Sequence, residues 1–342
     1  SDHNIMYVQR VGGGSFSAPA SVYAGSTNDS RRPDVALDSA GTLHMVWVEG
    51  TAPNRDIYYA TRTSAGVISA ASNLSSTPAQ DENNPRIHVD STGRVHVCWE
   101  GATATPPATT AIFYRRTSGS VFAAVQTLPF ATGGVAAESP DVATDAGDLV
   151  YVVWAESNGT RRNIRMMRSD DNGANFGNVA SGYVAGGSTD MSEPRVACGA
   201  LGDVYAVFSA QDSGGDRGVY FAYTRTGGTF VAPVAMYTSA TGGARSPYVA
   251  LHSRSGGGDT VIVAFNDGAA GGGSILVRAS HDSGANWPGD PVNLSQGNCQ
   301  PATNRLPVLA MDDNEVAAGW DGQPTGGGVV RTFSSISGYT LP

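Results

Sequence analysis

Apolar and polar residues alternate along this chain in short runs of period two, and polar turns rich in Gly, Asp and Ser separate the runs. Such alternation predicts half-buried β-strands, and no 3.6-residue apolar periodicity with helix caps is evident. Typical neighbouring runs are "RRPDVAL" and "LHMVWVE", which are joined by "DSAGT". Asp starts a tight turn and Gly accepts a positive φ, so each pair of runs is expected to form a hairpin. The pattern predicts an all-β fold.

This hairpin pattern occurs six times, and each copy opens on a proline. The prolines are Pro33, Pro85, Pro140, Pro194, Pro247 and Pro307, at spacings of 52, 55, 54, 53 and 60 residues. An aromatic residue follows each proline after 13 to 18 residues: Trp47, Trp99, Trp154, Phe208, Phe265 and Trp320. A second hairpin, such as "DIYYATRTSAGVISAAS", follows the aromatic. A repeat of this length holds four strands, which is one blade of a β-propeller.

We therefore expect a single domain over residues 1–342, a six-bladed β-propeller of four-stranded antiparallel blades. Its inner-strand repeats start near residues 31, 83, 138, 192, 245 and 305. The N-terminal "NIMYVQRVGGGSFSAP" resembles an outer hairpin, and it is expected to close the ring by pairing into the last blade. The C-terminal "GVVRTFSSISGYTL" resembles an outer hairpin too, so a seven-bladed or truncated ring is the alternative.

Composition and charge narrow the classes of function. All 21 basic residues are arginine, and 30 acidic residues give a net charge of −9, which disfavours nucleic acid and anionic membranes as partners. No apolar run is long enough to insert into a membrane. Cys98, Cys198 and Cys299 are widely spaced, and the six histidines lack metal-ligand spacing, so we expect neither a metal site nor a cofactor. Cys98 is expected to be a buried thiol, and one disulfide among the three cysteines remains open.

Two octets, "SDDNGANF" and "SHDSGANW", share the spacing Ser-x-Asp-x-Gly-x-x-aromatic. The matching positions are Ser169, Asp171, Gly173 and Phe176 in the first, and Ser280, Asp282, Gly284 and Trp287 in the second. The carboxylate is expected to accept backbone N–H bonds across the turn, and the aromatic to pack between sheets. The octets resemble the Asp-box, or BNR repeat, of the sialidase-like propellers. The resemblance implies structural turns in outer hairpins, on the face opposite the active site.

Charged residues gather at the other ends of the predicted strands, before the prolines and after the aromatics. The candidates for a ligand pocket at the propeller axis are Arg31, Arg245, Arg305, Glu49, Glu100 and Glu156. The sialidases that this chain resembles bind a substrate carboxylate with three arginines, and they use a Tyr nucleophile paired with Glu and an Asp acid/base. By that resemblance Arg31 of "RRP" is the first arginine, Arg245 the third, Asp56 the acid and Glu193 the catalytic Glu.

Two of the family's six roles have no matching residue. The second arginine should lie in "VFSAQD" and the Tyr nucleophile in "NDGAAGGGSILV", and neither segment contains one. Tyr248 or Tyr339 would serve only in another register. We therefore expect a secreted or cell-surface, non-catalytic module or scaffold that binds a glycan or a surface protein. The alternative is an exo-sialidase or a related glycoside hydrolase. Glycosidase chemistry other than that of sialidases needs only two converging carboxylates.

Overall fold

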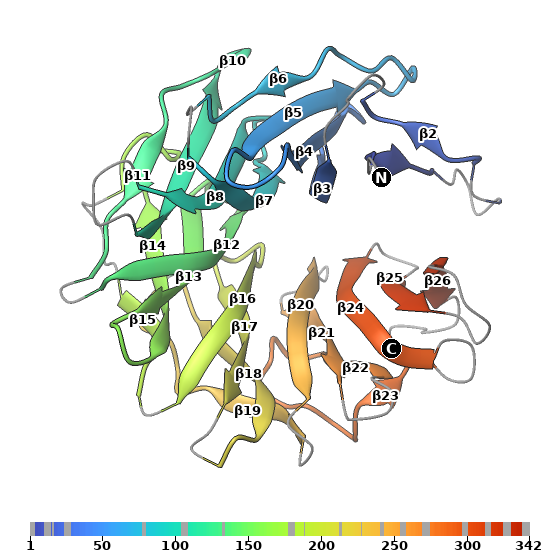
Figure 1. Cartoon of the computed structure of the whole chain (residues 1–342). Coiled ribbons are helices and arrows are strands. Elements are labelled where there is room, and N and C mark those ends of the chain that lie inside the picture. The colour runs from blue at the N-terminus through green and yellow to red at the C-terminus, as the bar shows by residue number, and fades with distance from the viewer. Residues whose placement is uncertain are drawn as a thin grey trace. The chain divides into compact units, whose positions relative to one another are not determined.

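The computed structural model is all-β, with the strands gathered into small antiparallel sheets (Figure 1). It describes residues 4–9, 15, 17–23, 29–76, 80–103, 109–131, 134–176, 182–187, 189–211, 214–226, 228–239, 243–253, 258–268, 274–295, 300–311, 316–323 and 330–336. Side chains are not described at 182 and 183, and from residue 300 onward they are described only at 307–309 and 318. Within these ranges, no helix is long and apolar enough to cross a membrane.

The chain divides into two compact units, Ser1–Val142 and Ala143–Pro342. In the first unit β1 (Met6–Tyr7) pairs with β2 (Ala20–Ser21). The next sheet has the order β3 (Ser30–Leu37), β4 (Leu43–Glu49), β5 (Asp56–Arg62) and β6 (Ser72–Asn73). A third sheet contains β7 (Glu82–Val89), β8 (Val95–Ala102) and β9 (Thr110–Ser118), and β10 (Val121–Phe122) and β11 (Gln126–Leu128) both pair with β9.

The boundary between the units falls within β12 (Ala136–Thr144), which begins the sheet continued by β13 (Val150–Ser157), β14 (Arg162–Ser169) and β15 (Gly182–Ala185). The next sheet comprises β16 (Asp190–Cys198), β17 (Val204–Gln211), β18 (Arg217–Thr224) and β19 (Val234–Ser239). It is followed by β20 (Ala244–Ser253), β21 (Asp259–Asp267), β22 (Ser274–Ser280) and β23 (Val292–Asn293), orange in Figure 1. The last described sheet is three-stranded, with β24 (Gln300–Met311), β25 (Val316–Gln323) and β26 (Val330–Ile336).

The second strand of each four-stranded sheet lies in the core. Its residues are buried on both faces, as in "VYVVWAE" of β13, because a neighbouring sheet or cluster covers each side. The repeated aromatic lies near the end of this strand and is at most 1% exposed at Trp47, Trp99, Trp154, Phe208 and Phe265. The regular spacing of proline and aromatic therefore reflects one packing position used in sheet after sheet.

Apolar clusters join consecutive sheets within each unit. In the first unit, Val46 and Ile57 pack with Val97 and Trp99 of the next sheet. In the second unit, Val207 and Phe221 of one sheet pack with Val263 and Phe265 of the next. The N-terminal hairpin contributes Ile5 and Val22 to a cluster with Met45, Trp47 and Ala60. Face-to-face packing of small twisted sheets is the arrangement that the repeats predict.

The connections between third and fourth strands differ in length. β10 (Val121–Phe122) follows the end of β9 at Ser118 closely, whereas β23 at Val292–Asn293 begins well after β22 has ended at Ser280. The two octets therefore begin longer connections, as "SHDSGANW" does between β22 and β23. The C-terminal "GVVRTFSSISGYTL" was predicted to resemble an outer hairpin. Residues 330–336 of it form one strand, β26, which pairs with β25, and residues 337–342 lie outside the described ranges.

Candidate functional site

The inner strands share an unusual backbone conformation at the residue before the proline. Five of these residues have a positive φ of 49° to 55°: Arg32, Asn84, Ser139, Glu193 and Ser246. The proline ring disfavours helical conformations at the preceding residue, and a positive φ is costly outside glycine. The strand register also shifts at this point in β3, β7, β16 and β20. Bulged, strained residues are found at functional sites when the surrounding structure holds them in place.

In the first unit, hydrogen bonds connect these positions across successive sheets. Arg32 Nη1 donates to Asn84 Oδ1, and Asn84 Nδ2 donates to Glu100 Oε1 at 2.7 Å. The other carboxylate oxygen of Glu100 accepts the Ser139 N–H at 2.6 Å. Glu100, a predicted ligand residue, therefore holds the strained residue of the next inner strand.

Arginines gather at the same strand ends of the first unit. The guanidinium of Arg31, another predicted ligand residue, is exposed and pairs with Asp29. Desolvation lowers the pKa of Arg32, and the nearby positive charges of Arg55 and Arg86 lower it further, although Glu100 opposes the shift. These arginines therefore lie within electrostatic range of one another.

In the second unit, Glu193 occupies a position like that of Glu100. Its Oε2 accepts the Ser209 hydroxyl at 3.1 Å and the Ser246 N–H at 2.8 Å. Neither partner is a tyrosine. Tyr248, the described candidate for a displaced nucleophile, packs against an apolar cluster, and Tyr339 lies outside the described residues.

Three arginines lie at or next to the first residue of a strand in three consecutive sheets: Arg162 in β14, Arg217 in β18 and Arg245 in β20. Arg162 opens β14 and binds the Asp190 carboxylate through two nitrogens, with Nε to Oδ1 at 3.0 Å. Arg217 opens β18, and burial lowers its pKa. The positive charges of Arg245 and Arg162 lower that pKa further, whereas the Glu193 carboxylate opposes the shift. The charges of Arg162, Arg245 and Glu193 therefore all act on the Arg217 guanidinium, and we call the three arginines the arginine cluster.

Arg217 and Arg162 are not among the residues predicted from the sequence. The second arginine was expected in "VFSAQD", at the end of the second strand. Arg217 instead begins the third strand, directly opposite Gln211 in the register, and donates to Gln211 Oε1 at 3.2 Å. The sequence feature that could have identified Arg217 is an arginine at the first residue of a third strand. Antiparallel pairing brings this residue to the end of the sheet where the second strand ends.

Two other predicted ligand residues are turned into their own sheets. Glu49 is 4% exposed and accepts hydrogen bonds from Ser30 Oγ at 2.6 Å and Trp47 Nε1 at 2.9 Å. Glu156 is 2% exposed and accepts the Trp154 Nε1–H at 3.2 Å. Each carboxylate therefore accepts a hydrogen bond from the N–H of a buried tryptophan at the repeated aromatic position.

Asp56, the proposed acid, opens β5 opposite Glu49 in the strand register. It accepts hydrogen bonds from Asn73 Nδ2 at 2.9 Å and Ser75 Oγ at 3.3 Å, so it joins β5 to the turn after β6. Arg305 lies in β24, but its side chain falls outside the described part of the chain.

Histidines at the opposite strand ends have structural partners. His96 contacts Tyr114 Oη at 2.6 Å and Asp90 Oδ2 at 3.1 Å, and His44 has the corresponding contacts with Tyr59 and Asp38. Among the described residues, no group of three His, Cys, Asp or Glu side chains has a metal-binding arrangement. Cys98 is a buried thiol, Cys198 also forms no disulfide, and Cys299 lies outside the described residues.

The two octets fold into the same turn. Asp171 accepts hydrogen bonds from Asn175 N at 2.8 Å and from the Ser169 hydroxyl at 2.7 Å, and Ser169 Oγ accepts the Gly173 N–H at 2.9 Å. The second octet repeats these contacts at 2.8, 2.7 and 2.9 Å among Ser280, Asp282, Gly284 and Asn286. Trp287 then packs edge-on against Phe221 of the preceding sheet, with 4.9 Å between ring centroids.

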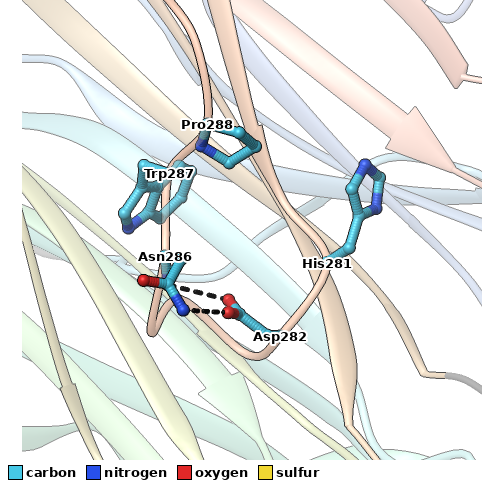
Figure 2. Close-up of a pocket in the computed structure, with 5 residues that line it drawn as sticks. All are labelled: His281, Asp282, Asn286, Trp287 and Pro288. Carbon is cyan, nitrogen blue, oxygen red and sulfur yellow. Dashed lines mark hydrogen bonds between the residues drawn. The ribbon is translucent and has the colours of Figure 1, made fainter.

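A shallow cavity of about 370 Å³ lies at the second turn, lined by His281, Asp282, Asn286, Trp287 and Pro288. Figure 2 shows Asp282 and Asn286 directed toward each other, with two hydrogen bonds between them, and His281 and Trp287 on opposite sides. Because these polar groups hold the turn itself, the cavity offers little to orient a ligand. The arginine cluster at the other strand ends is the stronger candidate site.

Comparison with known proteins identifies the fold. No family model and no curated protein matches the sequence. A protein of unknown function from Dyadobacter fermentans shares 14% identity at a TM-score of 0.67, over 92% of this chain and 96% of that chain. The leech intramolecular trans-sialidase, solved with 2,7-anhydro-Neu5Ac, shares 11% identity at a TM-score of 0.63, over 92% of this chain and 69% of that one.

A polysaccharide lyase is also similar in structure. This ulvan lyase, solved bound to -[GlcA(1-4)Rha3S]-, shares 12% identity at a TM-score of 0.58, over 87% of this chain and 77% of that chain. Identities this low show the fold alone. Together with the repeated sheets and their packing, they show that the chain has the fold of the sialidase-like propeller proteins.

Proposed function

We propose that this protein is a non-catalytic module that binds an anionic glycan through the arginine cluster. The observation that carries the proposal is that Arg162, Arg217 and Arg245 lie at or next to the first residue of a strand in three consecutive sheets, and that the charges of the other two act on Arg217. Guanidinium groups bind carboxylate and sulfate through charge-assisted, bidentate hydrogen bonds, so such a cluster suits an acidic sugar. The leech enzyme and the ulvan lyase, whose folds are similar, were both solved with acidic sugars.

The hydrogen-bond partners of the described glutamates favour binding over hydrolysis. A covalent mechanism requires a nucleophile beside its activating group. Here the Glu193 carboxylate accepts hydrogen bonds from Ser209 and Ser246, and Glu49 and Glu156 each accept a structural hydrogen bond from an indole. A glycoside hydrolase remains the alternative function.

The finer architecture belongs to the same proposal. We infer that the sheets are the blades of one six-bladed ring, in which the N-terminal strands complete the last blade. The N-terminal hairpin and the last sheet, which has three strands among the described residues, support this inference, because a fourth outer strand would complete that blade. The module would then act as a secreted or cell-surface protein, with a glycan or a glycosylated surface protein as partner.

Calorimetric titration with 3′-sialyllactose, oligogalacturonate and a sulfated oligosaccharide tests the proposal, with lactose as the neutral control. We expect binding of at least one acidic probe that weakens with added salt. Arg217→Ala should reduce the affinity by about tenfold or more, since one hydrogen bond to a charged group contributes about 1.5–3 kcal/mol. Arg94→Gln is the matched control, because Arg94 pairs with Asp90 at the opposite strand ends. Equal binding of lactose, or no binding of any acidic probe, contradicts the proposal.

The alternative is tested by activity. The protein should release no fluorophore from a fluorogenic sialoside or from other aryl glycosides, and it should form no unsaturated uronate ends from ulvan. Turnover that Glu193→Gln or Arg245→Ala abolishes would establish an enzyme in place of a binding module.

A further inference from the structure

Glu193 and Glu100 perform the same task in two different sheets. Each carboxylate accepts one hydrogen bond from a side chain of its own sheet, Ser209 or Asn84. Each also accepts the backbone N–H of the serine before the next proline, Ser246 or Ser139, at 2.8 and 2.6 Å. Both serines have a positive φ, 52° and 55°. The carboxylate therefore holds the strained residue near the start of the next inner strand.

The two carboxylates come from different positions of the repeat. Glu100 directly follows Trp99 and pairs with Asn83 in the register, whereas its donor Asn84 precedes the proline. In the later sheet the residue types are exchanged. The acceptor Glu193 precedes the proline, and its donor Ser209 follows Phe208 and pairs with Ser192. In both sheets, one of the two positions (before the proline, or after the aromatic) has the carboxylate, and the other has the residue that donates a hydrogen bond to it.

The residue held by Glu193 is adjacent to the arginine cluster. Ser246 directly follows Arg245, and the register shift in β20 lies between Arg245 and Tyr248. A backbone held at positive φ fixes the direction in which the preceding side chain leaves the strand. Without the Glu193 bond, the Ser246 amide would lose a charged acceptor and the strained conformation would lose its main support.

We propose that Glu193 is a positioning residue that fixes Arg245 within the arginine cluster by binding the Ser246 amide. It does not transfer a proton or contact the ligand. Its negative charge lies among the arginines, so it also reduces the attraction of the cluster for anions. The ligand-binding part of this inference rests on the proposed function, whereas the hold on Ser246 does not.

Four variants test the positioning role. Glu193→Ala removes the acceptor. Glu193→Gln keeps an acceptor oxygen without the charge. The double variant Glu193→Asn with Ser209→Glu recreates the arrangement of Asn84 and Glu100. Glu100→Ala removes the equivalent bond in the first unit and serves as the matched control.

Hydrogen exchange at the Ser246 amide reports on its hydrogen bond to Glu193 without any ligand. We expect fast exchange in Glu193→Ala, and protection close to wild type in Glu193→Gln, in the double variant and in Glu100→Ala. Protected Ser246 in Glu193→Ala, or fast exchange in the double variant, would overturn the inference whether or not the protein binds glycans.

Titration with the acidic probe that the wild type binds measures the consequence. Glu193→Ala should lose about tenfold in affinity, the effect of losing one charged hydrogen bond. Glu193→Gln should bind at least as tightly as wild type, and the double variant should regain most of the loss. A Glu193→Gln variant as weak as Glu193→Ala would show that the charge acts directly on the ligand. If no acidic probe binds the wild type, the proposed function fails, and the exchange result still decides the role of Glu193.

Discussion

A substitution in the second octet tests whether this turn contributes to stability or to ligand binding. Asp282→Ala removes a carboxylate that accepts hydrogen bonds from Ser280 Oγ at 2.7 Å, Asn286 N at 2.8 Å and Asn286 Nδ2 at 2.6 Å. The side chain is exposed, so each bond contributes near the lower end of the usual range, and the three together contribute about 2–3 kcal/mol.

For a cooperative unit of this size, 1 kcal/mol corresponds to roughly 2–4 °C in melting temperature. We therefore expect Asp282→Ala to lower the melting temperature of the second unit by about 5–10 °C in differential scanning calorimetry, while the affinity for the acidic probe stays within a factor of two or so. Asp290→Ala is the control, because Asp290 is a nearby exposed carboxylate outside the turn. The reasoning is refuted if Asp282→Ala leaves the melting temperature unchanged, or if it weakens probe binding as much as Arg217→Ala does.

Two further predictions concern the same turns. Burial tends to raise the pKa of Asp171, but hydrogen bonds from Asn175 and Ser169 outweigh it and lower the pKa to about 2. The stability contributed by this carboxylate is present above pH 4 or so and is lost as the pH falls toward about 2. Urea titrations should therefore show that the free energies of unfolding of wild type and Asp171→Asn converge over that interval. A difference in unfolding free energy that stays constant down to about pH 2 would contradict this. Gly284→Ala should cost about 2–4 kcal/mol, because φ is +81° and a Cβ would lie 2.4 Å from Phe221 Cζ. Gly289→Ala, with φ at +69° and no atom within 4 Å of the added Cβ, should cost only about 1 kcal/mol, and equal losses would exclude the steric explanation.

The sequence alone was sufficient to predict an all-β fold of repeated antiparallel sheets, because each sheet repeats the same local pattern. Period-two alternation, a proline and an aromatic at fixed separation, and Asp and Gly in the turns are local signals, and each recurs in sheet after sheet. The octets were identified correctly as turns for the same reason, since all the hydrogen bonds that define them lie within seven residues. The sequence pattern does not specify where short fourth strands such as β23 begin, because they pair across long connections with weak patterns.

The arrangement of the candidate site depended on tertiary structure. The sequence predicted Arg245 and Glu193 as site residues but did not single out Arg217, which strand pairing brings opposite Gln211. No local pattern shows that Glu193 binds the amide of a residue 53 positions later, or that Glu49 turns inward to an indole. Turns and strands follow from neighbouring residues, whereas the partner of a carboxylate at a strand end depends on which sheet packs beside it.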